Sequence, residues 1–357
     1  MAIMRFLLHR QKLPQYNTID DVVTLLNSRT NILVITGAGI STNLGIPDFR
    51  SKNTGFYSKL AAQGIDNPED IFELSRFKED PALFFEHAGE TFPNVRQYSP
   101  THAFIRLLQD KGKLLTNYTQ NIDNLEEVAG ISEDRLVQCH GSWASATCLE
   151  CGHTVRGDEI RDTVTKGEIP YCPACITRLA QPPSQPSGKR KRSPNTSSKP
   201  NKRRRPSFAS SSSLSSDDNM PTPGVLKPGI TFFGESLPTR FFDRFRHHDL
   251  ALVDMVIVIG TSLKVAPVSE IPLAVGREVP QVYVGREACK HVCFDVTLLG
   301  DCDEVVGELV RRGGWGWGGV GEGMVGGGKG REKGGGVEEV RLEVVDEEKA
   351  WWSVRKV

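Results

Sequence analysis

The sequence predicts an α/β protein: a mainly parallel sheet with helices on both faces, joined to a small metal-binding module. Short apolar runs rich in Val, Ile and Leu alternate along the chain with segments of helical periodicity, a pattern typical of buried parallel strands joined by crossover helices. Two Cys-x-x-Cys pairs with 20 residues between them stand in the middle of the chain, which is the spacing of a structural zinc site.

Length and composition are those of a globular chain. The 357 residues, of which 38% are hydrophobic and 25% charged, can bury a sizeable core, and no apolar run approaches the roughly 18 residues of a membrane helix. The start of the chain is apolar and mildly basic; a mitochondrial presequence is one interpretation, and an amphipathic helix ending near Pro14 is the preferred one. Without a secretory signal, we expect the eight cysteines to be reduced or metal-bound.

The helices and strands each have a local signal. An early helix begins at a capping box formed by Thr18 and Asp21, and another begins at Ser99, with Pro100 as its first residue and Gly112 just past its end. Apolar or β-branched runs predict the buried strands "NILVITG", "KLLTNYTQN", "RLVQCHG", "DMVIVIGTS" and "PQVYVGRE". A last helix is expected in "DCDEVVGELVRRGG".

Two segments do not fit this core. Residues 182–224 are rich in Pro and Ser, hold nine Lys or Arg against Asp217 and Asp218, and are expected to be disordered. Residues 313–336 contain 14 glycines in 24 positions, which is typical of a flexible linker. The residues beyond them could form a short strand or helix, and folded structure is expected to end at residue 312.

The two cysteine pairs are expected to bind one zinc ion through four thiolates, those of Cys148, Cys151, Cys172 and Cys175. Each pair directs two sulfurs at one point, and the loop between the pairs lets the second arrive from the opposite side. The alternatives are a redox pair of the thioredoxin type and the replacement of one thiolate by His153. The other cysteines are most simply small buried side chains: Cys139, Cys289, Cys293 and Cys302.

Two further features lie at predicted strand ends, where parallel sheets bind ligands. His140 ends the strand "RLVQCHG" and could act as a base near neutral pH, although a structural histidine is the commoner role for such a residue alone. Gly37 and Gly39 follow "NILVIT" and would let backbone amides approach a phosphate. The motif is weak, because Thr42 replaces the third glycine of the dinucleotide fingerprint.

Taken together and in order, the motifs are far more specific. They are "GAGISTNLGIPDFRS", "TQNIDNLE", "QCHGS", the two cysteine pairs, "PGITFFGESLP" and "GTSLKVAP". Over residues 6–306, interrupted only by the insert, the chain resembles the sirtuins, which are NAD-dependent protein-lysine deacylases, and particularly the fungal members of their nuclear, histone-deacetylating class.

The resemblance implies a catalytic domain over residues 1–312. Its large, Rossmann-like NAD-binding part would span about 15–140 and 225–306, and its small zinc-ribbon part about 141–181, with a cleft between the two. The disordered insert at 182–224 and the Gly-rich tail at 313–357 complete the expected organisation.

The resemblance also implies the chemistry. The acetyl oxygen of a substrate lysine displaces nicotinamide from NAD, which is consumed as a co-substrate, and His140 acts as general base on a ribose hydroxyl so that this hydroxyl attacks the imidate. The residues implied on the phosphate side are Gly37, Ala38, Gly39, Ile40 and Ser41. Those implied around the nicotinamide and its ribose are Pro47, Asp48, Phe49, Arg50, Tyr57, Gln120, Asn121, Ile122 and Asp123, and those on the adenosine side are Gly260, Thr261, Ser262, Gly285, Arg286 and Cys302.

The block "PGITFFGESLP" is implied to offer its backbone as an edge to the acetyl-lysine peptide, through Thr231, Phe232, Phe233, Gly234 and Glu235. Without the resemblance, two phenylalanines in a strand would be assigned to core packing. Three departures from the family limit the inference. Thr231 replaces the usual Val beside the acyl group, Gly285 replaces an Asn that contacts the adenosine ribose, and Ala88 and Thr91 replace the Tyr and Arg of desuccinylating relatives, which argues against acidic acyl groups.

The expected function is therefore NAD-dependent deacetylation of histone tails in transcriptional silencing, in the nucleus and within a silencing or repressor complex. Mono-ADP-ribosyl transfer in the same pocket and a catalytically decayed chromatin scaffold are the alternatives. The basic clusters "GKRKR" and "NKRRR" resemble a bipartite signal for an import receptor, with weak nonspecific DNA contact or an inert spacer as other interpretations. No membrane partner is expected.

Overall fold

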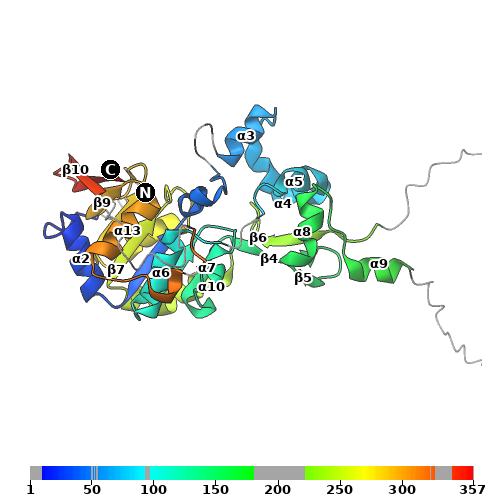
Figure 1. Ribbon diagram of the computed structural model, residues 1–357. Coiled ribbons are helices and arrows are strands. Elements are labelled where there is room, and N and C mark those ends of the chain that lie inside the picture. Colours follow the sequence, from blue (N-terminus) through cyan, green and yellow to red (C-terminus); the bar gives the residue numbers. More distant parts are fainter. Residues whose placement is uncertain are drawn as a thin grey trace, which may run out of the picture.

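The computed structural model describes residues 10–49, 51, 53, 55–92, 97–180, 222–321, 323–325 and 340–356. The expected first helix, Arg50 and most of the basic insert fall outside these ranges. Figure 1 shows two parts side by side, a large part built on the main sheet and a small module. Among the described residues, none of the helices combines the length and apolar character needed to cross a bilayer.

The large part is built on an eight-stranded sheet in the order β10-β11-β9-β8-β7-β1-β2-β3. The strands are β1 (Ile32–Thr36), β2 (Leu114–Thr119), β3 (Leu136–Gln138), β7 (Met255–Ile259), β8 (Gln281–Gly285), β9 (Val296–Leu299), β10 (Val340–Asp346) and β11 (Trp351–Lys356). All neighbours pair in parallel except β10 with β11. The six strands from β9 to β3 have the order of a doubly wound dinucleotide-binding sheet, so the predicted Rossmann-like fold is confirmed.

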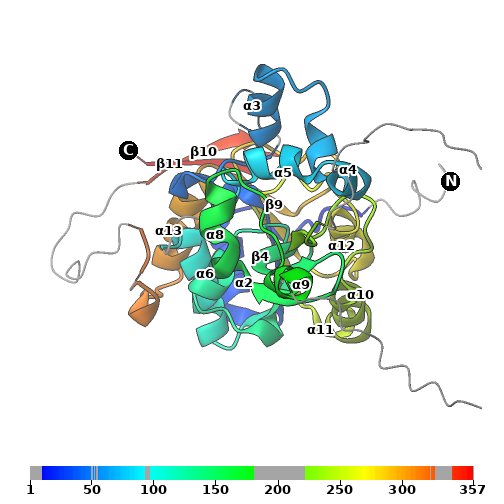
Figure 2. The same ribbon diagram turned by 90° about the vertical axis from the view of Figure 1, so that its right-hand side faces the viewer.

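Helices cover both faces of the sheet, because strand side chains alternate between two apolar clusters. Ile32 and Val34 of β1 pack on one side, against α2 (Ile19–Ser28), α6 (Pro100–Asp110) and α13 (Cys302–Arg312). Leu33 and Ile35 pack on the other. That second layer contains α10 (Thr239–Arg244), the π-helix η5 (Phe245–Asp249), α11 (Leu250–Leu252), η6 (Val268–Glu270) and α12 (Ile271–Ala274). Figure 2 shows α2, α6 and α13 on the side opposite α10, α11 and α12.

The predicted helix boundaries follow the capping signals. Thr18 and Asp21 form the reciprocal capping box of α2. Ser99 caps α6, Pro100 is its first residue, and Gly112 beyond its end has φ = +67°. The remaining short elements are η1 (Ala38–Ile40), η2 (Thr42–Leu44), α7 (Leu125–Val128), η4 (Glu133–Arg135) and η7 (Gly318–Gly321).

The small module contains more of the chain than the sequence suggested. Its antiparallel sheet joins β5 (Thr154–Arg156), β4 (Gly141–Cys148) and β6 (Leu226–Ile230). Its helices are α3 (Phe56–Ala62), η3 (Pro68–Phe72), α4 (Leu74–Glu79), α5 (Pro81–Ala88), α8 (Gly157–Thr165) and α9 (Pro173–Ala180). β6 and the helices α3 to α5 were expected in the large part, but one aromatic core that includes Phe84, Trp143 and Phe232 holds them to the module.

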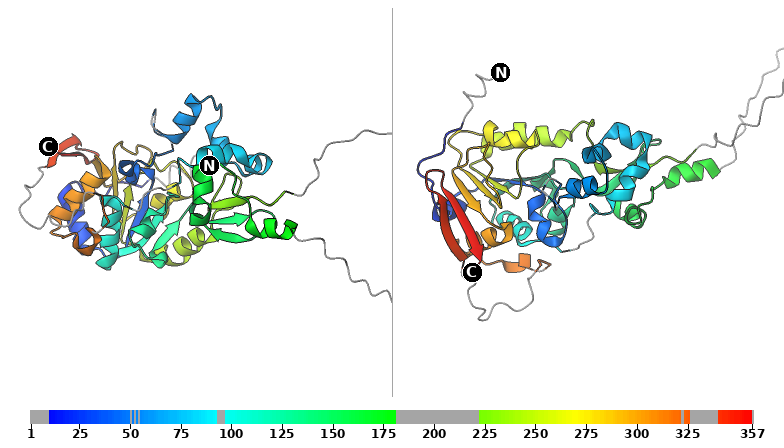
Figure 3. Two further views of the ribbon diagram at one scale, coloured as in Figure 1. Left: turned by 45° about the vertical axis from the view of Figure 1, so that its right-hand side comes forward. Right: turned by 90° about the horizontal axis from the view of Figure 1, so that it is seen from above.

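The C-terminal segment differs from the predicted tail. β10 and β11 form a hairpin, and β11 extends the sheet by pairing with β9, at the end of the large part away from the small module (Figures 1 and 3). Val354 is fully buried, and Val320 packs into the same core, where its carbonyl accepts a 2.9 Å hydrogen bond from the Tyr98 hydroxyl. The hairpin covers an edge of β9 that would otherwise present unpaired backbone groups, so folded structure extends beyond residue 312.

Candidate active site

The predicted site residues that follow strands of the large sheet lie at one edge of it. β1, β2, β3, β7 and β8 are parallel, so the segments that follow them all emerge at the same edge. Strand order reverses between β1 and β7, and the loops after these two strands therefore diverge to opposite sides. This is the position at which doubly wound sheets bind ligands.

The glycine turn after β1 packs directly on the loop after β7. The Gly39 amide donates a 2.8 Å hydrogen bond to the Gly260 carbonyl. A Cβ on Gly39 would lie 2.7 Å from that oxygen, and one on Gly37 would lie 2.6 Å from the Thr261 Cβ. Both glycines are thus required by close backbone approach, in addition to the phosphate contact predicted for them.

A small pocket opens beside this turn, on the side of β2. It is lined by Ala38, Ser41, Ile46, Pro47, Phe49, Thr91, Asn121, Ile122 and Asp123. Ile46 and Thr91 are the lining residues that were not predicted to contact the nucleotide. The Ser41 hydroxyl donates a 2.6 Å hydrogen bond to Asp123, while the buried Asn121 Oδ1 has no partner among the described residues. An amide ligand would satisfy that acceptor, so the pocket suits a nicotinamide group.

His140 stands between the large sheet and the small module. Its Nδ1 lies 3.0 Å from the Gln120 carbonyl oxygen, and its own carbonyl accepts a 2.8 Å hydrogen bond from the Thr231 amide. A carbonyl can only accept, so Nδ1 carries the proton and Nε2 presents its lone pair. Burial lowers the pKa of His140 below its usual range, against the opposing effect of the Gln120 bond, and the neutral imidazole is therefore the base form at neutral pH.

The segment after β6 is only partly available to a substrate. Phe232 is buried in the aromatic core, whereas Phe233 is 47% exposed. The Phe233 amide and carbonyl already pair with Phe72 and Leu74. Glu235 accepts hydrogen bonds from the Phe232 amide at 2.7 Å and from Lys227 Nζ at 2.8 Å, so its carboxylate holds the turn in place.

The loop implied to cover the nicotinamide ribose is anchored by an aromatic side chain. Phe49 packs against Phe56, Tyr57 and Phe72, with ring centroids 5.7 to 6.1 Å apart. The Asp48 carbonyl accepts a 2.7 Å hydrogen bond from the Phe56 amide. Pro47 and Phe49 therefore reach the pocket from the small-module side.

The residues implied to contact the adenosine side lie at or just beyond the ends of β7, β8 and β9. Gly260 and Gly285 end neighbouring strands, and Ser262 is exposed. Arg286 forms an ion pair with Asp301 at 2.8 Å. Cys302, predicted to be small and buried and also to contact NAD, is buried at the first turn of α13.

A buried polar cluster behind the pocket was missed from the sequence. His102, Asp123 and Glu126 are fully or almost fully buried, and their ligating atoms lie within 4.8 Å of one another. Neither oxygen of Glu126 nor His102 Nε2 has a hydrogen-bond partner in the described part of the chain. Burial, followed by the Asp123 charge, raises the pKa of Glu126 to about 8, and burial lowers that of His102 to about 3. No local motif joins these residues, because they come from α6 and the start of α7.

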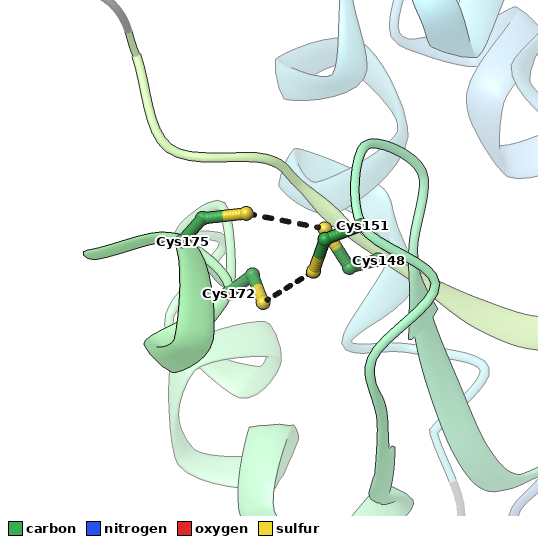
Figure 4. Close-up of side chains that lie close together, drawn as sticks. All are labelled: Cys148, Cys151, Cys172 and Cys175. Atoms are coloured by element: carbon green, nitrogen blue, oxygen red, sulfur yellow. Dashed lines mark hydrogen bonds between the residues drawn. The ribbon is translucent and has the colours of Figure 1, made fainter. Parts of the chain in front are cut away.

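The four predicted zinc ligands converge in the small module, as Figure 4 shows. Sγ of Cys148 lies 3.8 Å from that of Cys175, and Sγ of Cys151 lies 3.6 Å from that of Cys172. With Zn–S bonds of about 2.3 Å, the sulfurs of a tetrahedral site lie about 3.8 Å apart, so this set fits a zinc ion and fills its coordination. His140 and His153 are not among the converging groups.

Comparison with known proteins agrees with this geometry. The chain matches the model of the Sir2 family over residues 37–267. It is 44% identical over 321 residues to the NAD-dependent histone deacetylase sir2 of Schizosaccharomyces pombe, covering 88% of this chain and 63% of that protein. It is 46% identical over 314 residues to the NAD-dependent histone deacetylase SIR2 of Saccharomyces cerevisiae, covering 88% of this chain and 53% of that protein. It is 44% identical over 319 residues to the NAD-dependent protein deacetylase HST1 of the same organism, covering 88% of this chain and 59% of that protein. The chain thus spans between half and two thirds of their length.

Removal of one thiolate should release the metal and unfold the small module. We expect Cys175→Ala to lose the single zinc ion per chain, because metal binding contributes roughly 10 to 16 kcal/mol to the folding of small zinc modules. Metal analysis gives the zinc content, and fluorescence of the buried Trp143 reports the module core. His153→Ala, at an exposed position of the same knuckle, should keep both; zinc loss there alone would contradict the four-thiolate assignment.

Glu126 should make the fold less stable as pH rises. Its folded pKa of about 8 exceeds its unfolded value, so above pH 6.5 the unfolded chain binds fewer protons than the folded one and stability falls. Between pH 6.5 and 8, Glu126→Gln should remove about 1 to 2 kcal/mol of this loss, because the pH dependence due to His102 is the same in both proteins. Urea unfolding at both pH values measures it, with the exposed neighbour variant Glu127→Gln as control. Equal pH dependence in Glu126→Gln and the unsubstituted chain would refute the assignment.

Proposed function

This chain belongs to the Sir2 family, and from that premise we propose that it is an NAD-dependent protein-lysine deacetylase acting on histones. The observation that carries the proposal is the neutral His140, whose Nδ1 is held by the Gln120 carbonyl while Nε2 remains available. The pocket residues Asn121 and Ile122 follow Gln120 directly, so the base and the pocket share one loop. The names of the fungal relatives support the same activity and substrate class.

In the proposed reaction each side chain has a separate task. Bound NAD would supply a ribosyl carbon, at which the acyl oxygen displaces nicotinamide as the leaving group, and a neighbouring ribose hydroxyl that must give up its proton. His140 accepts that proton at Nε2, and its Nδ1–H bond to Gln120 stabilises the imidazolium that results. Asn121 would bind the nicotinamide amide through its free Oδ1, and the Ser41–Asp123 pair fixes the pocket wall. The zinc ion would hold the small module and take no part in the chemistry.

The proposed acyl group is small and uncharged. Thr91 lines the pocket, where it presents a short side chain with its hydroxyl bonded to the Ala88 carbonyl at 3.0 Å. Ala88 and Thr91 stand where desuccinylating relatives carry Tyr and Arg, so neither position supplies a partner for an acidic acyl group. Acetyl-lysine fits this surface better than a succinylated lysine.

We further propose that the protein acts in the nucleus, in a silencing or repressor complex. Histone substrates support this location, and the clusters Lys189–Arg192 and Lys202–Arg205 would bind an import receptor. Nine cations in this insert would also give weak, salt-dependent contact with DNA.

Substitution of the base should abolish turnover without unfolding the protein. We expect His140→Ala to lower NAD-dependent deacetylation of an acetylated histone-tail peptide by at least about 100-fold, the usual contribution of a general base. Mass detection of all products separates O-acetyl-ADP-ribose from an ADP-ribosylated protein. His153→Ala is the matched control, since that side chain is exposed and outside the site. Near-normal turnover in His140→Ala would exclude the proposed role.

Replacement of Lys202–Arg205 by alanine in the full chain should reduce nuclear accumulation several-fold, because a bipartite signal needs both clusters. Fluorescence microscopy of a tagged chain measures the nuclear fraction. Alanine at the exposed Lys78 and Lys166 is the control for loss of positive charge in general. Unchanged accumulation in the cluster variant would leave the import role without support.

A further inference from the structure

Tyr283 occupies the space that a side chain at position 285 would need. The two residues lie on the same face of β8, because strand side chains alternate. A Cβ built on Gly285 would lie 2.8 Å from the Tyr283 hydroxyl oxygen and 3.1 Å from Cζ. Real Cβ atoms are not found at the shorter distance, so any larger residue at 285 must displace the hydroxyl. Tyr283 therefore explains why the usual Asn could not be accommodated at position 285 without a change in the packing.

The Tyr283 ring is not free to move aside. It is 4% exposed and packs against Phe294, with ring centroids 5.2 Å apart. Its hydroxyl donates a 3.1 Å hydrogen bond to the Thr261 carbonyl, across from β8 to the loop after β7. Burial raises the pKa of Tyr283 above its usual range, so the hydroxyl remains a donor at all working pH values.

Thr261 connects this bond to the rest of the site. Its Oγ1 accepts a 2.8 Å hydrogen bond from Gln120 Nε2, and Gln120 is the residue whose carbonyl holds His140. Its Cβ is the atom that a side chain on Gly37 would strike. The position of the Thr261 backbone therefore affects both the glycine turn and the loop after β2.

We propose that Tyr283 is a positioning residue for NAD: its hydroxyl fixes the Thr261 carbonyl, and Gly285 is the residue that leaves room for it. The inference rests on the proposed function, since it assumes that the loop after β7 binds the adenosine half of NAD. Gly285 is thus more than the loss of a side-chain contact to the adenosine ribose, because Gly285 and Tyr283 depend on each other. In this pair a larger residue at 285 acts by pushing the hydroxyl away from Thr261.

A double-mutant cycle tests the coupling. NAD binding to the zinc-loaded full chain is measured by calorimetry without acyl substrate, for Tyr283→Phe, Gly285→Ala and the double variant. Each single change should weaken NAD binding roughly three- to tenfold, the effect of one hydrogen bond. The double variant should bind no more weakly than Tyr283→Phe alone and at least as well as Gly285→Ala, because the hydroxyl oxygen, which is the atom nearest to the added Cβ, is then absent.

The outcomes separate this inference from the proposed function. Tyr118→Phe is the control: it removes another buried tyrosine hydroxyl of the same apolar layer, bonded to Asp249 at 2.6 Å and not to Thr261, and should lower the unfolding temperature without changing NAD affinity. If the unsubstituted chain fails to bind NAD, the proposed function is overturned. If the unsubstituted chain and Tyr283→Phe bind NAD equally well, the positioning role is overturned while the proposed function stands. The same holds if the losses of affinity of the two single variants multiply in the double variant. Should Gly285→Ala unfold, recovery of folding and NAD binding in the double variant supports the role, and its absence overturns it.

Discussion

The site depends on the close approach of two backbone loops where the order of the sheet reverses. The Gly39 amide bonds to the Gly260 carbonyl at 2.8 Å, across the gap between the ends of β1 and β7. Little space is left for side chains between these loops, so their contact is made largely by backbone atoms. The loops after β2, β3 and β8 are placed relative to this contact through Gln120, His140 and Tyr283.

The two parts of the molecule divide the work between them. The loops of the large sheet supply most of the pocket lining and His140, while the small module supplies Phe49 and the segment after β6. His140 is the junction, because its ring bonds to the large part and its carbonyl accepts the Thr231 amide. A closed four-thiolate metal site suits this arrangement, since it fixes the module without competing for substrate.

Local signals predicted much of the fold and the ends of its elements. Thr18 and Ser99 cap the helices that begin beside them, and the fully buried runs of β1 and β7 mark the central strands. The spacing of the two cysteine pairs predicts the four-thiolate metal site in the same local way. Contacts distant in sequence were beyond reach. Nothing local to Val354 indicates that β11 pairs with β9, and nothing local to His102 places it beside Glu126. For Phe232, core packing and substrate contact could not be separated until its burial was known.

The two sides of the proposed nucleotide site differ in how much change they can tolerate. Around the pocket, Asp123, Glu126 and His102 share a buried space, so a charge gained or lost on one of them acts on the other two at low dielectric. On the adenosine side, Ser262 and Arg286 are exposed, and water can compensate for a lost contact. The departure at Gly285 from the usual family residue falls on this second side. The exposed contacts on this side can therefore change singly, whereas Gly285 is buried against Tyr283, so these two positions can change only together.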